Sequence, residues 1–397
     1  MEVDPSLRLI RQRIVLEQRA AYIGDPIERL RFLRREMRHG LNARNALRIS
    51  FRWLARQHAW GMALLLVMSV GYTASRVQGV PEIRPTILPP PLQIPSPLIT
   101  NPSPVWLVAR KEGVEIYSNG LRINGRFEAS NLPRGSYRVF SRAQTDVRHA
   151  QMQSGPSGIV FHTTESMLAP FQAEQNKTIQ KISVEVMNFV RENHSYHYLI
   201  DRFGGVFRIV KESDVAYHAG HSVWADENKV YVNLNTAFLG VAFETQTQTG
   251  SSIPTATPAQ IDAARVLTEL LRQRYHIAVE NCVTHAQVSV NPINHRIGFH
   301  TDWADKFPFL EIGLRDNYQQ PPASLFAFGF EYDPGFVAST GARLLPGLLQ
   351  AEGQVASRAA ELNQTISQYK TTLQKNYREI TGDAPTGETS KENTNEK

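Results

Sequence analysis

The sequence predicts a mixed α/β domain in which helices flank a central β-sheet, and three observations support this class. Four short apolar runs bounded by turn residues are typical of buried strands. Two longer segments have the apolar spacing of helices, and they alternate with the strand candidates along the chain. Such an alternation packs helices against a sheet. The strand candidates are 159–161, 196–201, 206–210 and 239–244, and the helix candidates are 178–192 and 258–275.

Residues 1–58, which precede this domain, form a basic segment. Nine arginines lie between Arg29 and Arg56, so the formal net charge of +6 is unevenly distributed. Apolar residues recur there at helical spacing, and a basic amphipathic helix is typical of binding to a membrane surface. A small solvated helix pair in the cytoplasm is the alternative. Charge alone would permit nucleic-acid binding, but the segments that follow favour a membrane, and we expect no nucleic-acid partner.

Residues 59–75 are apolar and carry no charge, which predicts a transmembrane anchor at the short limit of spanning length. More than fifty residues precede this run, whereas a cleaved signal peptide has only a short basic region before its apolar core. The arginine excess predicts that the N-terminus stays in the cytoplasm. A buried core helix is the alternative, although the neighbouring segments offer no core. We therefore expect a single-pass protein of the cytoplasmic (inner) membrane.

Two segments connect the anchor to the α/β domain. Residues 76–104 contain nine prolines, a density that gives an extended, semi-rigid linker. Residues 105–150 contain short alternating runs separated by Asn119-Gly120 and Asn124-Gly125, the sequence signature of hairpin turns. The second segment is predicted to be a small β unit.

A turn-rich segment at 284–303 concentrates potential metal ligands. It contains three histidines, among them His285 and His300, together with Asp302. Imidazole and carboxylate groups suit Zn²⁺, and a catalytic zinc needs three protein ligands and an open position for water. The segment offers two of the three. His162, at the end of the strand candidate 159–161, is the best donor upstream.

Five motifs in this order resemble one family of enzymes. They are His162 at a strand end, Tyr-His-Tyr-Leu-Ile-Asp-Arg-Phe-Gly-Gly at 196–205, Ala-Tyr-His-Ala-Gly at 216–220, Gly-Val-Ala-Phe-Glu at 240–244, and the segment 284–303. Together they resemble the zinc-dependent N-acetylmuramoyl-L-alanine amidases of type 2, whose fold is shared with peptidoglycan recognition proteins. The resemblance covers roughly residues 150–320 and implies an amidase domain at 151–322.

The resemblance implies a zinc ligand set. His162 and His285 match the two zinc histidines of the family, and Asp302 matches the third ligand. The gap between His285 and Asp302 is longer than is usual, as though residues 290–296 were inserted, which leaves His300 as an alternative ligand. If Asp302 is the ligand, His300 takes the place of the cationic group that stabilises the transition state, a lysine in many relatives.

The resemblance also implies roles for three further residues. Glu244 lies where a subset of the family carries a catalytic glutamate and is the candidate general base, the alternative being a solvated strand end. Tyr196 lies where other members place a tyrosine near the metal, although a structural aromatic is the alternative. His218 lies in a motif that lines the groove in relatives and is the candidate substrate contact.

The C-terminal part is predicted to be an extension. In residues 323–380, apolar side chains from Val355 to Ile380 follow spacings of three and four, which indicates a heptad-like helix. This helix would either self-associate, giving a homo-oligomer, or pack on the catalytic domain. Residues 381–397 are polar and charged and are predicted to be disordered.

These features predict a membrane-anchored zinc amidase acting on peptidoglycan on the periplasmic or extracellular side. It would hydrolyse the amide bond between N-acetylmuramic acid and L-alanine. The first alternative keeps the fold without the chemistry, as a protein that binds muropeptides without cutting them. The second is a membrane-anchored scaffold whose amidase domain serves for targeting.

Overall fold

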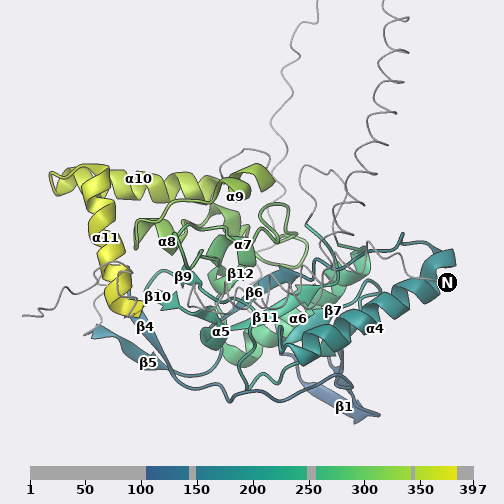
Figure 1. Cartoon of the computed structure of the whole chain (residues 1–397). Helices are drawn as coiled ribbons and strands as arrows, with labels where there is room; N and C mark the ends of the chain where they lie inside the picture. Colours follow the sequence, from purple (N-terminus) through teal and green to yellow (C-terminus); the bar gives the residue numbers. More distant parts are fainter. Residues whose placement is uncertain (1–103, 143–148, 248–255, 341–344, 382–397) are drawn as a thin grey trace, which may run out of the picture. The chain divides into compact units, whose positions relative to one another are not determined.

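The computed structural model describes residues 104–142, 149–247, 256–340 and 345–381 (Figure 1). The predicted basic segment 1–58, the predicted membrane span 59–75, all of the linker before Pro104 and the tail after Thr381 lie outside these ranges. Among the helices that the structure describes, none is long and apolar enough to cross a membrane. The predicted anchor therefore stays a prediction.

The centre of the fold is an eight-stranded sheet with the order β1-β2-β3-β8-β7-β11-β6-β12. Strand β6 pairs in parallel with both β11 and β12, and every residue of these three strands is buried. Burial on both faces explains why their sequences read as continuous apolar runs. The strands are β1 (Leu107–Lys111), β2 (Val114–Tyr117), β3 (Arg122–Asn124), β6 (Gly158–Thr163), β7 (Tyr198–Ile200), β8 (Val206–Arg208), β11 (Phe238–Phe243) and β12 (Cys282–Thr284).

A second, antiparallel sheet has the order β5-β4-β10-β9. Its strands are β4 (Tyr137–Ser141), β5 (Gln151–Gln153), β9 (Val223–Ala225) and β10 (Lys229–Val232). The strands expected between 105 and 150 therefore do not form a sheet of their own. Strands β1 to β3 extend the large sheet beyond β8, and β4 pairs with β10, because the open edges of β8 and β10 need hydrogen-bond partners.

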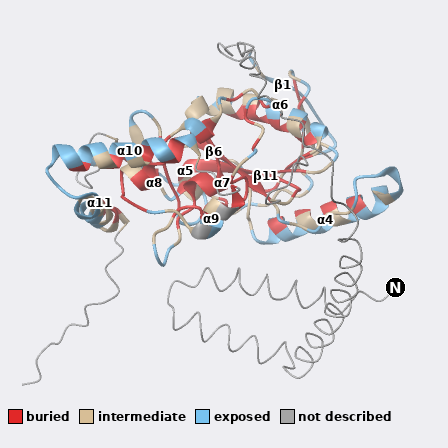
Figure 2. Ribbon diagram, turned by 90° about the horizontal axis from the view of Figure 1, so that it is seen from above, coloured by how far each residue is buried: buried red, intermediate tan, exposed pale blue. Residues whose placement is uncertain are grey.

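Helices cover both faces of the large sheet, which confirms the predicted mixed α/β class. Helix α6 packs with Tyr198 and Ile200 of β7, whereas α4 packs with Leu199 between them, so the two helices lie on opposite faces. Figure 2 shows α4 with one buried and one exposed side. The helices are α4 (Asn176–Glu192), α5 (Leu234–Ala237), α6 (Pro258–Tyr275), α7 (His285–Val288), α8 (Ala323–Phe326), α9 (Pro334–Ser339), α10 (Pro346–Glu361) and α11 (Ile366–Thr381), with short 3-10 turns at Ala173–Gln175, Val279–Asn281 and Asn317–Gln319.

Helix α6 has the bounds expected from the sequence because its first residues carry strong start signals. The Thr257 side chain accepts a hydrogen bond from the backbone N–H of Gln260, and the Gln260 side chain accepts one from the N–H of Thr257. Pro258 occupies the first turn, where its missing N–H leaves no unmet bond.

The heptad-like segment forms two helices instead of one. Asn363 adopts a left-handed φ of 54°, which ends α10. Thr365 and Gln368 then form a capping box that starts α11. Leu362 and Ile366, which flank the break, are exposed, whereas Val355, Ala359, Leu373 and Ile380 of the heptad-like series are buried.

The C-terminal helices share a core with the second sheet. Phe328, Phe330 and Tyr377 cluster with Phe140 of β4 and Val230 of β10. Figure 2 shows α10 buried on one side and exposed on the other. Packing on the domain, one of the two outcomes expected for this segment, therefore describes its apolar residues, and self-association stays a prediction.

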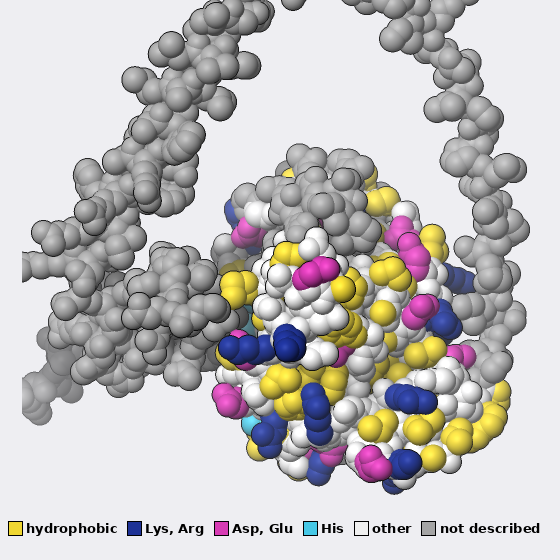
Figure 3. Space-filling view, turned by 90° about the vertical axis from the view of Figure 1, so that its right-hand side faces the viewer, with side chains coloured by type: hydrophobic (Ala, Val, Ile, Leu, Met, Phe, Trp, Pro, Cys, Tyr) yellow, Lys and Arg dark blue, Asp and Glu magenta, His cyan; other side chains and the backbone are white. Residues whose placement is uncertain are grey.

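Charge is mixed over the face of the domain seen in Figure 3. Basic and acidic side chains alternate there with apolar ones and do not separate by sign. The clustered arginines of the sequence lie in the segment 1–58, outside the described residues.

Candidate active site

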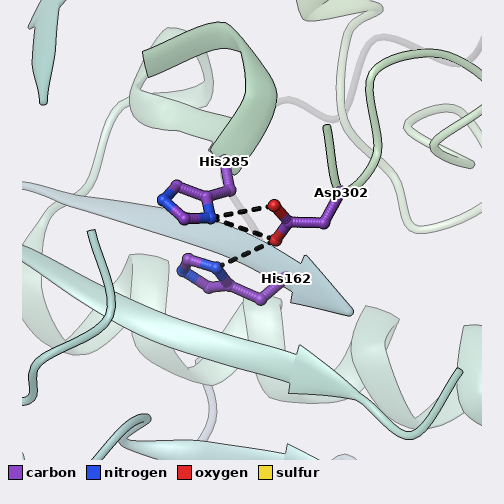
Figure 4. A group of neighbouring side chains, drawn as sticks. All are labelled: His162, His285 and Asp302. Carbon is purple, nitrogen blue, oxygen red and sulfur yellow. Dashed lines mark hydrogen bonds and ion pairs between the residues drawn. The ribbon is translucent and has the colours of Figure 1, made fainter. Parts of the chain in front are cut away.

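Three of the predicted metal ligands meet at one edge of the large sheet (Figure 4). His162 lies near the carboxyl end of β6, and His285 begins α7 directly after the neighbouring parallel strand β12. Asp302 reaches the same point from the following loop. Its Oδ2 lies 3.2 Å from His162 Nδ1, and its Oδ1 lies 2.9 Å from His285 Nδ1.

Local interactions fix the two loops that bear His285 and Asp302. Thr284 and Gln287 form a capping box at the start of α7, so the His285 backbone is held in the first turn. Trp303, next to Asp302, is buried, and its indole N–H donates to the carbonyl of His162 at 3.0 Å. Strand β6 and the Asp302 loop are thereby joined beside the ligands.

The geometry of this cluster fits a zinc ion. One donor atom from each residue lies within 4.8 Å of the other two, and all three residues are buried. Zinc in tetrahedral coordination has ligand distances of about 2.0–2.2 Å, which places neighbouring donor atoms roughly 3.3–3.6 Å apart. The observed separations of 2.9 and 3.2 Å are slightly shorter, so a small outward movement would admit the ion.

The protonation states also fit a metal ion. Burial would raise the pKa of Asp302, but His285 and His162 hold it well below its usual range, so the carboxylate is ionised. Burial, reinforced by His285, lowers the pKa of His162 to about 4, so its imidazole is neutral. Ionised carboxylate and neutral imidazole are the forms that bind metals.

His300 lies beside the cluster and not within it. Its ring stacks on that of His285, with centroids 4.4 Å apart and planes at 17°. Both the N–H and the carbonyl of His300 are bonded to the Ser289 hydroxyl, a support that sequence reasoning did not identify. Among the described residues, the group able to hold a metal contains Asp302 and not His300, which favours Asp302 as the third ligand.

The charge expected on His300 does not match its surroundings. Desolvation of the ring and the adjacent His285 lower its pKa, although the residue is exposed by its accessible surface and solvent moderates the effect. The direction of the shift favours a neutral imidazole. His300 can then act on a developing oxyanion through an N–H donor but not through a full positive charge.

Tyr196 precedes β7 and Glu244 follows β11, and both strands lie on the same side of β6 in the sheet. The Tyr196 ring is 5.0 Å from the His162 ring. Glu244 follows β11, two residues beyond Ala242, which pairs with His162, so by strand alternation it belongs to the same face of the sheet.

The Glu244 carboxylate is buried against α4. Ser183 donates to its Oε2 at 2.6 Å, whereas its Oε1 is buried with no hydrogen-bond partner among the described residues. Burial raises the pKa of Glu244 to about 7, partly opposed by the bond from Ser183. Such a group exchanges a proton readily near neutral pH.

His218, expected as a substrate contact, is 5% exposed. Its Nδ1 lies 3.2 Å from His162 Nε2, and its Nε2 lies 3.3 Å from the carbonyl oxygen of Phe238. Its neighbour Tyr217 is exposed instead. The placement favours support of His162 over contact with a substrate. Gly240 makes this position possible, because a Cβ there would lie 2.6 Å from the His218 ring.

The segment before His300, where the insertion was expected, is held by the C-terminal part of the chain. The His295 ring stacks on Phe330 at 5.3 Å and meets the edge of Tyr377 at 5.4 Å. Ile297 bonds through its N–H to Glu331 and through its carbonyl to the N–H of Asp333. Residues beyond 323 therefore support the loop that leads to the ligands.

Comparisons with known proteins agree with the resemblance seen in the sequence. Residues 152–302 match a family described as N-acetylmuramoyl-L-alanine amidase. Over 106 residues the chain is 32% identical to the N-acetylmuramoyl-L-alanine amidase AmiD of Escherichia coli K12, a match that spans 24% of this chain and 37% of AmiD. The chain therefore spans little more than a third of the length of that relative.

Solved structures show more distant similarity. AmpDh3 from Pseudomonas aeruginosa is 22% identical, covering 49% of this chain and 86% of that one, with a TM-score of 0.33. E. coli AmiD in complex with anhydro-N-acetylmuramic acid-L-Ala-D-γ-Glu-L-Lys is 23% identical, covering 45% and 58%, with a TM-score of 0.26. Drosophila PGRP-LB is 12% identical, covering 41% and 85%, with a TM-score of 0.26.

Proposed function

We propose that this chain is a zinc-dependent amidase acting on peptidoglycan or its fragments, because residues 152–302 match the N-acetylmuramoyl-L-alanine amidase family. The bond cleaved is the amide between the lactyl group of N-acetylmuramic acid and L-alanine. The observation that carries the proposal is the buried cluster of His162, His285 and Asp302, which retains a candidate for each of three zinc ligands.

Each side chain near the cluster has a proposed role. A zinc ion held by the three ligands supplies Lewis acidity, which polarises a carbonyl and acidifies water. Glu244, with a pKa near 7, accepts a proton from the attacking water and returns it to the leaving amine. His300 donates an N–H to the oxyanion, and Tyr196 orients the scissile group from beside His162.

The proposed location rests on the sequence. The uncharged run 59–75 and the arginines before it support a single-pass anchor in the cytoplasmic membrane, with the catalytic domain on the periplasmic or extracellular side. Protease added outside spheroplasts should then digest the catalytic domain and spare the basic segment 1–58. Protection of the catalytic domain would contradict this topology.

The deciding experiment measures bound zinc and muropeptide release by the purified full chain. Asp302→Ala should lose both. His300→Ala should keep the metal and lose about 10²–10³-fold in turnover, as expected for an oxyanion donor. Glu244→Ala should keep the metal and lose about 10²–10⁴-fold, as expected for a general base. Asp305→Ala, a nearby carboxylate outside the cluster, is the matched control and should change neither.

Other outcomes would change the assignment. If His300→Ala loses the metal while Asp302→Ala keeps it, His300 is the third ligand. If the unmutated chain binds peptidoglycan and releases nothing, it is a recognition protein or a scaffold and not an enzyme.

A further inference from the structure

Three consecutive contacts link the ligand cluster to the backbone of the sheet. The carbonyl oxygen of Phe238 lies 3.3 Å from His218 Nε2. His218 Nδ1 lies 3.2 Å from His162 Nε2. His162 Nδ1 lies 3.2 Å from Asp302 Oδ2, the contact drawn in Figure 4. Each contact needs one proton if it is to be a hydrogen bond.

The two imidazoles supply only two protons for these three contacts. Both rings are buried, His162 at 0% and His218 at 5% exposure. An imidazole that binds a metal ion is neutral, and the ring nitrogens of His218 face a second imidazole and a carbonyl oxygen, so no carboxylate holds a second proton on that ring. A neutral imidazole carries one N–H. Neither the carbonyl nor the ionised carboxylate has a proton to donate, so one contact always lacks a proton.

Three arrangements keep the two N–H groups from facing each other, and they differ in where the proton is missing. In the first, His218 Nε2–H donates to Phe238, His162 Nε2–H donates to His218, and a bare His162 Nδ1 faces Asp302. In the second, both N–H groups are on Nδ1, and a bare His218 Nε2 faces the Phe238 carbonyl. In the third, His162 Nδ1–H donates to Asp302, His218 Nε2–H donates to Phe238, and bare nitrogens of the two rings face each other. Two acceptors that face each other repel unless a cation lies between them.

A bound metal ion favours the first arrangement, because the ion takes the place of the proton missing between His162 Nδ1 and Asp302. At the Asp302 end, the carboxylate has His285 Nδ1 within 2.9 Å and keeps 8% exposure, so an ion or water can reach it. The Phe238 end is closed, because Phe238 is fully buried and the guanidinium of Arg134 lies beyond its carbonyl at 3.4 Å. A metal ion can replace the missing proton only at Asp302.

We propose that His218 is a positioning residue that fixes His162 as its Nε2–H tautomer and so presents the Nδ1 lone pair to the metal. The inference rests on the metal site of the proposed function and adds a role for His218 to it. The Phe238 carbonyl sets the direction of the chain of hydrogen bonds, and Gly240 leaves room for the His218 ring to complete it.

Two substitutions at His218 separate this role from simple packing. His218→Leu keeps a side chain of similar size and removes both nitrogens. His218→Asn places an amide oxygen near the former Nδ1, so it can still accept from His162 Nε2–H. We expect His218→Leu to weaken zinc binding by the full chain about 10–100-fold, the range typical of residues that orient a metal ligand. His218→Asn should recover most of that loss.

The tautomer can be observed without any substitution at His218. In the zinc-loaded, ¹⁵N-histidine-labelled full chain, long-range ¹H–¹⁵N spectra distinguish protonated from bare ring nitrogens, and the spectrum of His162→Gln identifies the His162 signals. We expect a proton on Nε2 and none on Nδ1. A proton on Nδ1 of His162 would overturn the proposal, as would a His218→Leu chain that binds zinc like the unmutated one.

Failure of this inference is distinguishable from failure of the amidase proposal. Zinc affinity and the tautomer are read without substrate, so a chain that binds zinc through this network and releases no muropeptide refutes only the enzyme. A folded His218→Asn chain that binds zinc as weakly as His218→Leu would refute the positioning role even if the unmutated chain is an active amidase.

Discussion

Gly240→Ala tests the packing that brings His218 to His162. The added Cβ would lie 2.6 Å from Cγ, 2.9 Å from Cβ and 3.0 Å from Cδ2 of His218. Carbon atoms in contact are about 3.5–4.0 Å apart, so the ring must retreat by about 1 Å. Gly240 is not among the glycines with positive φ, so an alanine there meets only a steric obstacle.

Two effects should follow from this displacement. Overpacking in a filled core costs about 1–3 kcal/mol, which urea unfolding of the metal-free chain would measure. The contact between His218 Nδ1 and His162 Nε2 is already 3.2 Å long and would be broken by a shift of that size. Zinc affinity, measured by competition with a chromophoric chelator, should then fall about 10-fold or more.

Gly353→Ala is the matched control. Gly353 lies within α10 on its exposed side, with nothing within 4 Å of the added Cβ. Alanine there should raise stability by about 0.5–1 kcal/mol and leave zinc binding unchanged. If Gly240→Ala destabilises the chain yet binds zinc normally, the link between His218 and the metal site is refuted, and an undiminished stability would refute the steric reasoning itself.

Glu244, Tyr377 and the metal give three further expected outcomes. Burial holds the pKa of Glu244 at about 7, above its ordinary 4.5, so between these values the folded metal-free chain binds more protons than the unfolded one. The free energy of unfolding should therefore fall as pH rises from 4.5 to 7, by up to about 3 kcal/mol, and Glu244→Gln should remove this slope. Tyr377→Ala deletes a buried ring packed on Phe328 and Phe330 and should cost about 3–5 kcal/mol in denaturant unfolding. Chelation should lower the melting temperature, because zinc at 1,000 times its Kd adds about 4 kcal/mol.

Each of these outcomes has its own check. An unchanged pH slope in Glu244→Gln would assign the slope to other groups. Tyr377→Phe keeps the ring and should lose far less stability than Tyr377→Ala, whereas equal losses would show that the hydroxyl matters more than the packing. A melting temperature indifferent to both chelator and added zinc would argue against a metal bound in the folded state.

Sequence reasoning succeeded where a local signal and the tertiary structure agree. The bounds of α6 followed from Pro258 and helical periodicity, and Thr257 caps the helix as its residue type permits. His285 and Asp302 were grouped because they share the segment 284–303, and His162, distant in the sequence, was added as the best upstream donor and matched through the resemblance. Their convergence depends on β6 and β12 being parallel neighbours, which a single sequence does not reveal.

The features missed by sequence reasoning depend on neighbours distant in the chain. The motif around His218 marks a site but does not say whether the ring faces solvent or His162. In the sequence, Gly240 is an ordinary small residue of a strand. Its role becomes evident only in the structure, where the His218 ring occupies the space that a side chain at 240 would need. The helix break at Asn363 and Thr365 had local signals, but the apolar spacing on either side obscured them.

The packing of His295 against Phe330 and Tyr377 has a practical consequence for where the protein can be divided. The family match ends at residue 302, with all three proposed ligands inside it. A fragment that ends at residue 302 would keep all three proposed ligands. It would lack Phe330 and Tyr377, the aromatic residues that hold His295 in the loop before Asp302. The smallest unit suited to expression and metal studies therefore runs through α11 to Thr381. Within that unit, substitutions in a terminal helix offer a way to adjust the metal site without altering any ligand.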